Sequence, residues 1–231
     1  MGTKLASFAA RPLQTATDQV FDTLYQAIIS LELPPGTKMS EAEIAGRLDV
    51  SRQPVRDAFY RLSKIGLLEV RPQRATLVTK ISETAVLNAA FVRIALEVEC
   101  LRAAFEQDGE RLIVQLRDNI AAQQHALDST DPAAFHALDE EFHRLICEHA
   151  GHEHVWGLIQ DHKAHLDRVR YLTLSQAHRA RVRGEHNEIL SALEADNFPL
   201  AELNLRRHLT GIKPHLESLR VKHAGYFEER P

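Results

Sequence analysis

Several features that define other protein classes are scarce or missing in this sequence. No run of apolar residues approaches the roughly 18 that a membrane-spanning helix needs, so no membrane span is expected. The N-terminal residues lack the apolar segment and cleavage pattern of a secretion signal. The two cysteines, Cys100 and Cys147, form no CxxC pair and predict no disulfide framework. We therefore expect a protein of the reducing cytoplasm.

Histidine is absent from the first 124 residues, whereas all 13 histidines lie between His125 and His223. Charge is uneven as well. Residues 1–80 carry 11 Lys/Arg against 8 Asp/Glu, and residues 81–231 carry 17 against 24. With 231 residues the chain is long enough for two modest domains. The basic first part and the acidic, histidine-rich second part indicate two functions, with any nucleic-acid partner expected at the first.

The first 80 residues contain short segments of helical spacing separated by turn residues. Apolar residues at steps of three and four predict a first helix that ends before Pro34. Ser40 and Ser51 are expected to cap a second and a third helix. Gly66 stands where the end of the third helix favours a glycine.

Residues 67–70 and 76–79 indicate two short strands joined by a turn. Three helices followed by a β-hairpin describe a winged helix-turn-helix, which we expect over residues 14–80. Residues 1–13 show no periodicity and are expected to form a flexible arm.

From residue 81 onward the pattern is helical throughout, with breaks at turn residues such as Asp108-Gly109. Six helices are expected, over residues 82–105, 110–128, 132–150, 152–178, 180–196 and 198–222. The predicted fold class is therefore mainly α. A winged helix-turn-helix is followed by a six-helix bundle at 81–224 and by a short tail at 225–231.

The start of the third helix carries residue types that read DNA. In a helix-turn-helix the N-terminal residues of this helix face base edges in the major groove. Arg52 and Arg56 share one helix face and suit guanine edges or phosphates, although a solvated arginine face is the alternative. Arg74, in the hairpin, is expected to reach phosphate or the minor groove. The predicted DNA-binding residues are Ser51, Arg52, Gln53, Pro54, Arg56 and Arg74.

Four residues of metal-ligand type face the interior of the predicted bundle. Asp139 and His143 are spaced i, i+4 on one helix, and His186 and His208 align with the apolar stripes of two others. Polar groups facing an apolar interior need partners, and one metal ion would satisfy all four. Three imidazoles and one carboxylate suit Zn, Ni, Mn or Fe. Ordinary core histidines are the alternative, and His136 is a spare ligand candidate.

The first part of the chain resembles a known family. The stretch EIAGRLDVSRQPVRDAFYRLSKIGLLEVRPQRATLV is similar to the DNA-binding domain of GntR-family bacterial transcription regulators, over about residues 15–80. The cap, proline, arginines and glycine fall in register with the family pattern. The sequence departs from that pattern at Asp57, where Glu is usual, at Phe59, where Leu is usual, and at Ala75, where many members have Gly.

The second part resembles the FadR-type C-terminal domain called FCD. The motifs that carry this resemblance are Asp139-x-x-x-His143, Glu185-His186 and His208-Leu209, and six helices are typical of its VanR-like branch. The resemblance implies that Asp139, His143, His186 and His208 bind a metal ion. It also implies that Arg93 holds the carboxylate of an effector, with Arg170 as a second candidate. A salt bridge of Arg93 with Glu97, four residues on, is the alternative.

The resemblance implies a ligand-responsive DNA-binding transcription regulator, most simply a repressor. It would form a homodimer, bind a palindromic operator in double-stranded DNA and respond to a small carboxylate effector. Two alternatives stay open: a metal-dependent hydrolase whose His3Asp site activates water, and a regulator that senses the metal itself. No placed general base supports the hydrolase, and an enzyme would not need the winged helix. A site buried among three helices favours ligand presentation over metal sensing.

Overall fold

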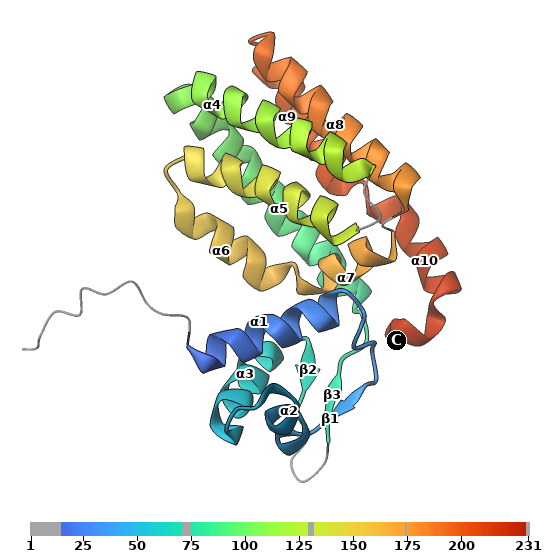
Figure 1. The fold of residues 1–231 in the computed structure, drawn as a ribbon. Coiled ribbons are helices and arrows are strands. Elements are labelled where there is room, and N and C mark those ends of the chain that lie inside the picture. The colour runs from blue at the N-terminus through green and yellow to red at the C-terminus, as the bar shows by residue number, and fades with distance from the viewer. Residues whose placement is uncertain (1–14, 71–74, 129–131, 174, 230–231) are drawn as a thin grey trace, which may run out of the picture.

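The structure, a computed structural model, describes residues 15–70, 75–128, 132–173 and 175–229. A small N-terminal winged helix lies against one end of a larger helical bundle (Figure 1), so the mainly α class is confirmed. The expected arm at 1–13 and the turn at 71–74, which contains Arg74, lie outside the described residues. Among the described helices, none is both long and apolar enough to cross a bilayer.

The winged helix holds three helices and a three-stranded sheet. Its elements are α1 (Ala16–Ile29), β1 (Lys38–Met39), α2 (Glu41–Leu48), α3 (Arg52–Lys64), β2 (Leu68–Glu69) and β3 (Thr76–Val78). Strand β3 lies between β1 and β2 and pairs antiparallel with both. The sequence pattern did not predict β1, because two residues are too few to show an alternation.

Local hydrogen bonds explain where these helices begin and end. Thr15 and Asp18 form a capping box at the start of α1, and the Ser40 side chain caps α2 as expected. Ser51 occupies the N-cap position of α3, but its side chain makes no capping bond and is exposed. Gly66 follows α3 with φ +76°, a conformation that glycine adopts at little cost.

The apolar core of the winged helix includes a residue from the second part of the chain. Side chains of α1, α2 and α3 pack with residues of the three strands, and Phe59 of α3 is buried among them. Ala164, which belongs to the bundle, is buried in the same cluster. The two parts of the molecule therefore share one core where they meet.

The bundle is built around one long helix. Its helices are α4 (Glu83–Leu127), α5 (Pro132–His149), α6 (Glu153–His162), α7 (Ala164–Leu172), α8 (Gln176–Glu194), α9 (Phe198–Thr210) and α10 (Leu216–Lys222), with 3₁₀ turns at Lys213–His215 and Ala224–Tyr226. Helix α4 packs against α5, α6, α7, α8 and α9. Near the C-terminus, Phe227 is buried and forms a parallel bridge with Ile81.

The break expected at Asp108-Gly109 is present as a kink within α4, where Asp108 has a non-helical φ of −154° and ψ of 53°. Two other expected helices are wrong in their bounds. The helix expected over 152–178 is divided at Lys163, where no glycine or proline signals a stop, and α8 starts earlier because Ser175 caps it. The helix expected over 198–222 is interrupted near Pro214.

Candidate metal centre and DNA-binding surface

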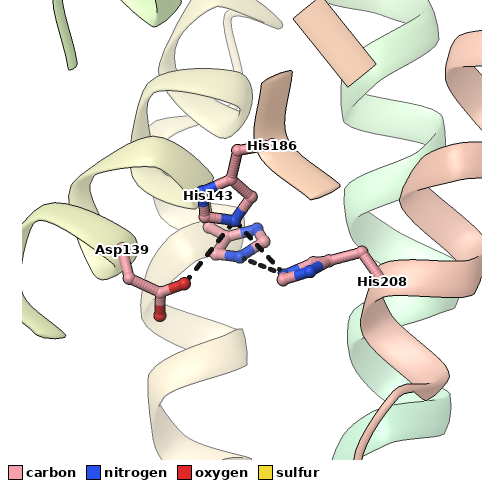
Figure 2. Close-up of side chains that lie close together, drawn as sticks. All are labelled: Asp139, His143, His186 and His208. Carbon is pink, nitrogen blue, oxygen red and sulfur yellow. Dashed lines mark hydrogen bonds and ion pairs between the residues drawn. The ribbon is translucent and has the colours of Figure 1, made fainter. Parts of the chain in front are cut away.

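Three helices bring the four predicted ligands together inside the bundle. Helix α5 supplies Asp139 and His143, α8 supplies His186, and α9 supplies His208. Figure 2 shows the carboxylate and the three imidazole rings converging on one point. One ligand atom from each residue lies within 4.8 Å of all the others. His143 and His186 are completely buried, and Asp139 and His208 nearly so.

Each imidazole faces the centre with Nε2, because a partner outside the centre takes its Nδ1. His143 Nδ1 lies 2.7 Å from Glu97 Oε2, on α4. His208 Nδ1 lies 2.8 Å from Glu185 Oε2, on α8. A carboxylate only accepts hydrogen bonds, so His208 Nδ1 carries the proton. The close approach of the Glu97 carboxylate favours the same tautomer for His143. Such outer partners are typical of metal-ligating histidines.

A chain of amides sets the tautomer of His186 independently. The backbone carbonyl of Leu138 can only accept, and the Asn119 side-chain amide donates to it at 3.0 Å. Gln123 Nε2 then donates to Asn119 Oδ1 at 2.7 Å, which leaves Gln123 Oε1 to accept from His186 Nδ1 at 3.0 Å. His186 Nε2 therefore presents a lone pair to the centre. No sequence signal pointed to Gln123, since its partner lies on another helix.

The centre therefore gathers acceptors without a donor between them. The Nε2 atoms of His143 and His208 are 3.2 Å apart, and those of His186 and His208 are 3.4 Å apart. Asp139 Oδ1 lies 3.5 Å from His186 Nε2 and has no hydrogen-bond partner among the described residues. Two ligands about 2.0–2.1 Å from one tetrahedral ion lie about 3.3 Å apart. The donor set fits a divalent transition-metal ion.

Burial keeps the three imidazoles neutral, as metal ligation requires. Loss of water lowers the pKa of His143, even though the nearby Glu97 carboxylate opposes this shift. Burial, together with the charges of neighbouring histidines and arginines, lowers the pKa of His186 and His208 well below the usual value. The three Nε2 lone pairs are therefore free of protons.

Arg93, the first effector candidate, lies beside the centre and is already engaged on one side. Its Nε donates to Glu97 Oε1 at 2.6 Å, and both side chains are buried. Burial alone would raise the pKa of Glu97, but Arg93 and His143 hold it well below its usual range. Arg93 Nη2 is buried without a hydrogen-bond partner in the part of the chain that the structure describes. The salt bridge and an available donor are therefore both present.

Arg170, the second candidate, holds the carboxylates of two neighbouring residues on α5. Its Nη2 bonds to Asp139 Oδ2, and its Nη1 donates to Glu140 Oε1 at 2.9 Å. Burial and the positive charge of Arg93 lower the pKa of Arg170 to about 9. Arg170 thus fixes the orientation of a predicted metal ligand.

The space beside the centre is small. A cavity of about 40 Å³ is lined by Arg93, Arg170, His178 and His208, among others. A second cavity of about 10 Å³ shares Arg170 and His178 with the first. One water molecule has a share of about 30 Å³ in the liquid, so an organic acid needs these walls to move apart.

His136, the spare ligand candidate, lies outside the four-residue centre. Its ring packs edge-on against Tyr171, with 4.9 Å between the ring centroids. Burial and the charge of Arg170 lower the pKa of His136 to about 3. It approaches Asp139 and Glu140, but Arg170 already pairs with both carboxylates.

The predicted DNA-binding residues occupy the exposed start of α3. Arg52, Gln53 and Arg56 are exposed, and Pro54 lies in the first turn. Glu41, at the start of α2, holds Arg56 through two parallel bonds of 3.1 and 2.9 Å. Arg56 is therefore paired with a carboxylate before DNA binds, and it must release Glu41 before it can contact a base or phosphate. No finding tests these contacts, which stay predictions.

Comparisons with known proteins agree with both parts of the molecule. Residues 16–78 match the family described as bacterial regulatory proteins, gntR family, and residues 89–211 match the FCD domain. The HTH-type transcriptional repressor RspR of Escherichia coli K12 is 34% identical over 219 residues. That alignment covers 94% of this chain and 96% of the relative.

Two solved structures share the fold. E. coli McbR/YncC superposes with a TM-score of 0.76 at 20% identity and covers 90% of this chain and 99% of that one. The metal-free FCD domain of the regulator TM0439 gives a TM-score of 0.51 at 21% identity. It covers 61% of this chain and 97% of that domain.

Proposed function

Because the chain belongs to the GntR family of bacterial transcription regulators and carries an FCD domain, we propose that it is a metal-containing, effector-responsive repressor. Membership makes it a DNA-binding transcription regulator and not an enzyme, which removes the hydrolase alternative. The name of the relative RspR supports repression. Because its DNA partner lies in the bacterial cytoplasm, we place the protein there.

We assign DNA binding to the winged helix at residues 14–80. Effector binding and dimerisation are assigned to the helical domain at 81–224. The exposed arginines at the start of α3 support DNA binding by the first part, and the buried polar centre supports ligand binding by the second. Two winged helices related by twofold symmetry would read a palindromic operator.

The observation that carries the metal assignment is the set of acceptors facing one another. Three Nε2 atoms and the Asp139 carboxylate converge, and the Nδ1 atom of each histidine lies against a partner outside the centre. The ligands would be Asp139, His143, His186 and His208, and Zn, Ni, Mn or Fe suits them. When bound, the ion would supply a Lewis-acidic centre, and an ion that takes more than four ligands would have a position for a carboxylate oxygen.

The charges around the centre support a monocarboxylate effector. The network around the centre contains four cations and five carboxylates: Arg93, Lys163, Arg170, Arg181, Glu97, Asp139, Glu140, Asp167 and Glu185. Its balance is one negative charge, which a divalent ion turns into one positive charge. Unbalanced buried charge is costly, and one carboxylate would restore neutrality. The unpartnered Nη2 of Arg93 is a donor for that carboxylate.

Metal sensing is the remaining alternative. In that case the metal ion itself, and not an organic acid, would change the affinity for DNA. The buried Nη2 of Arg93, which has no hydrogen-bond partner among the described residues, favours an organic effector, because a pure metal sensor would need no such donor beside the centre. A response to the ion alone, with no response to any acid, would reverse this preference.

The test is metal analysis of untagged protein, followed by selection of genomic DNA fragments. About one ion per chain is expected, as are enriched fragments that share an inverted repeat. A panel of small carboxylic acids should include one that releases these fragments, and Arg93→Lys should weaken that release. Lysine keeps a charge beside Glu97 and removes the Nη2 donor. If metal content is far below one ion, and Zn, Ni and Mn give no thermal shift, the metal centre is refuted.

A further inference from the structure

Helix α7 is short, yet it buries an unusual number of polar side chains. His165, Asp167 and Arg168 are buried within its nine residues, and Lys163, just before it, is buried as well. Buried charges need partners, and these partners lie in two different parts of the molecule. Figure 1 shows α7 where the winged helix meets the bundle.

One set of partners belongs to the winged helix and its connection to the bundle. The Tyr25 hydroxyl, on α1, donates to Asp167 Oδ2 at 3.2 Å. Burial raises the pKa of Tyr25, so the hydroxyl keeps its proton and remains a donor. Arg168 donates to the backbone carbonyl of Thr79 at 2.6 Å. Since Ala164 also packs in the winged-helix core, α7 holds the winged helix through polar and apolar contacts.

The other set of partners belongs to the candidate metal centre. Arg170, near the end of α7, bonds to Asp139 and Glu140. Lys163 Nζ lies 2.5 Å from Glu140 Oε2 and 2.5 Å from Asp167 Oδ2. Burial alone would lower the pKa of Lys163, but the negative charges of Asp167 and Glu140 have the larger effect and raise the pKa of Lys163. An unbroken series of contacts therefore runs from Asp139 to Tyr25.

A ligand at the centre cannot leave this series unchanged. Arg170 holds Asp139 Oδ2 while Oδ1 faces the histidines, so an ion that draws on this carboxylate competes with Arg170. Arg170 also walls both small cavities, so an effector that enlarges them displaces it. Beside α7, a cavity of about 690 Å³ separates α1 and α3 from α4 and α6, which leaves room for the winged helix to tilt.

We propose that α7 transmits occupancy of the metal centre to the winged helix, and that Asp167 and Tyr25 are the positioning residues at its far end. The inference rests on the proposed function, because it takes the four-residue centre as the ligand site. It adds a route that runs from Asp139 through Arg170, Glu140, Lys163 and Asp167 to Tyr25.

The test uses the full chain, with Zn²⁺ alone as the ligand and hydrogen–deuterium exchange as the readout. Tyr25→Phe removes one hydroxyl and leaves the aromatic ring in place. Tyr226→Phe is the matched control, because Tyr226 lies near the C-terminus outside this series. Zn²⁺ affinity is measured for each protein by titration.

In the wild type, Zn²⁺ should slow exchange in α5, α8 and α9 and also in α1. For α1, we expect the exchange rate without Zn²⁺ to be about fivefold or more the rate with Zn²⁺, which is the lower end of typical coupling between two sites. In Tyr25→Phe this ratio of rates should fall below about twofold. Zn²⁺ affinity and protection of α5, α8 and α9 should persist in Tyr25→Phe. Tyr226→Phe should behave as the wild type.

Two outcomes overturn the route and leave the metal centre standing. One is protection of α5, α8 and α9 without any change in α1. The other is a Tyr25→Phe variant in which Zn²⁺ slows exchange in α1 as much as it does in the wild type. A hydroxyl that only stabilises the fold would change the exchange rate equally with and without Zn²⁺ and would leave this ratio unchanged. A wild type in which Zn²⁺ protects none of these helices overturns the proposed metal centre, and the route with it.

Discussion

Arg52 and Arg56 stand one helical turn apart but differ in what holds them. Glu41 engages Arg56 through both of its carboxylate oxygens, so DNA binding must replace that pair. Arg52 is exposed at the first position of α3. We therefore expect Arg52 to contribute more to operator affinity than Arg56.

Arg52→Ala should weaken operator binding by about 1–3 kcal/mol, the usual loss for an arginine that contacts a base. Fluorescence anisotropy with a labelled operator measures it, and light scattering should show an unchanged oligomeric state. Arg206→Ala, on the exposed face of α9, is the control and should bind normally. Equal affinity of Arg52→Ala and wild type would refute α3 as the reading helix.

His186→Ala should lose the bound ion, because it removes one of three converging Nε2 atoms. An ion that binds only the native state stabilises it by about 2.7 kcal/mol at a hundredfold excess over Kd. Chelation should therefore lower the melting temperature of the wild type and leave that of His186→Ala unchanged. The exposed His154 supplies the control variant His154→Ala, which should still respond to chelator. A chelator response in His186→Ala would contradict the ligand assignment.

Gly66→Ala and Gly157→Ala should change stability in opposite directions. Gly66 has φ +76°, and a Cβ there would lie 3.0 Å from His165 Nε2. A left-handed L-residue costs about 1–2 kcal/mol. Gly157 lies within α6 with nothing within 4 Å of an added Cβ, so alanine should stabilise by about 0.5–1 kcal/mol. Urea unfolding measures both, and a stabilised Gly66→Ala would contradict the argument.

Among the helices, those with local stop signals were the predictable ones. Ser40 and Gly66 marked the ends of α2 and α3 correctly, and Asp108-Gly109 marked the kink in α4. The division at Lys163 has no local signal, because it depends on packing of the next residue, Ala164, in a distant core. Helix propensity cannot report such a contact.

In the candidate site, too, the sequence predicted some residues and not others. Spacing and resemblance were enough to predict Asp139, His143, His186 and His208 as a group, and the structure brings them together. The partners that orient them could not be read from spacing, since Gln123 meets His186 only after α4 and α8 pack. The ligand roles themselves stay predictions until metal is measured.

Helix α7 should make stability depend on pH through His165. Burial and the charge of Arg168 lower its pKa to about 3, and Nδ1 accepts the Ser82 N–H at 3.1 Å. Between this value and the unfolded pKa of about 6.5 the unfolded chain binds more protons, so stability falls as pH falls. From pH 7 to pH 5 the loss from this residue is about 2 kcal/mol, at about 1.36 kcal/mol per pKa unit.

His165→Gln should remove that share of the pH dependence. The measurement is urea unfolding of both proteins at pH 7 and pH 5, compared as a difference of differences. Other buried histidines titrate in both proteins and cancel. An equal loss of stability in wild type and variant would show that His165 is protonated in the folded protein.

At the scale of the whole molecule, we expect a twofold-symmetric dimer, the commonest form of homo-oligomer. Leu87 and Phe91 of α4 are large apolar side chains with 37% and 72% of their surface exposed. We expect a second copy of the chain to cover them. Light scattering at micromolar concentration should give twice the mass of one chain, and the selected operator should be an inverted repeat. A monomer both with and without DNA would contradict this expectation.

Ala164 also limits how this protein can be cut and recombined. The winged-helix core is completed by a residue about 85 positions beyond its last strand, so the set of residues that packs in this core is discontinuous in sequence. A chimera that takes only residues 15–80 from this chain would leave that core unfilled at Ala164, unless the recipient supplies a matching helix. Exchange of operator specificity between relatives should therefore succeed when residues 164–172 travel with the winged helix.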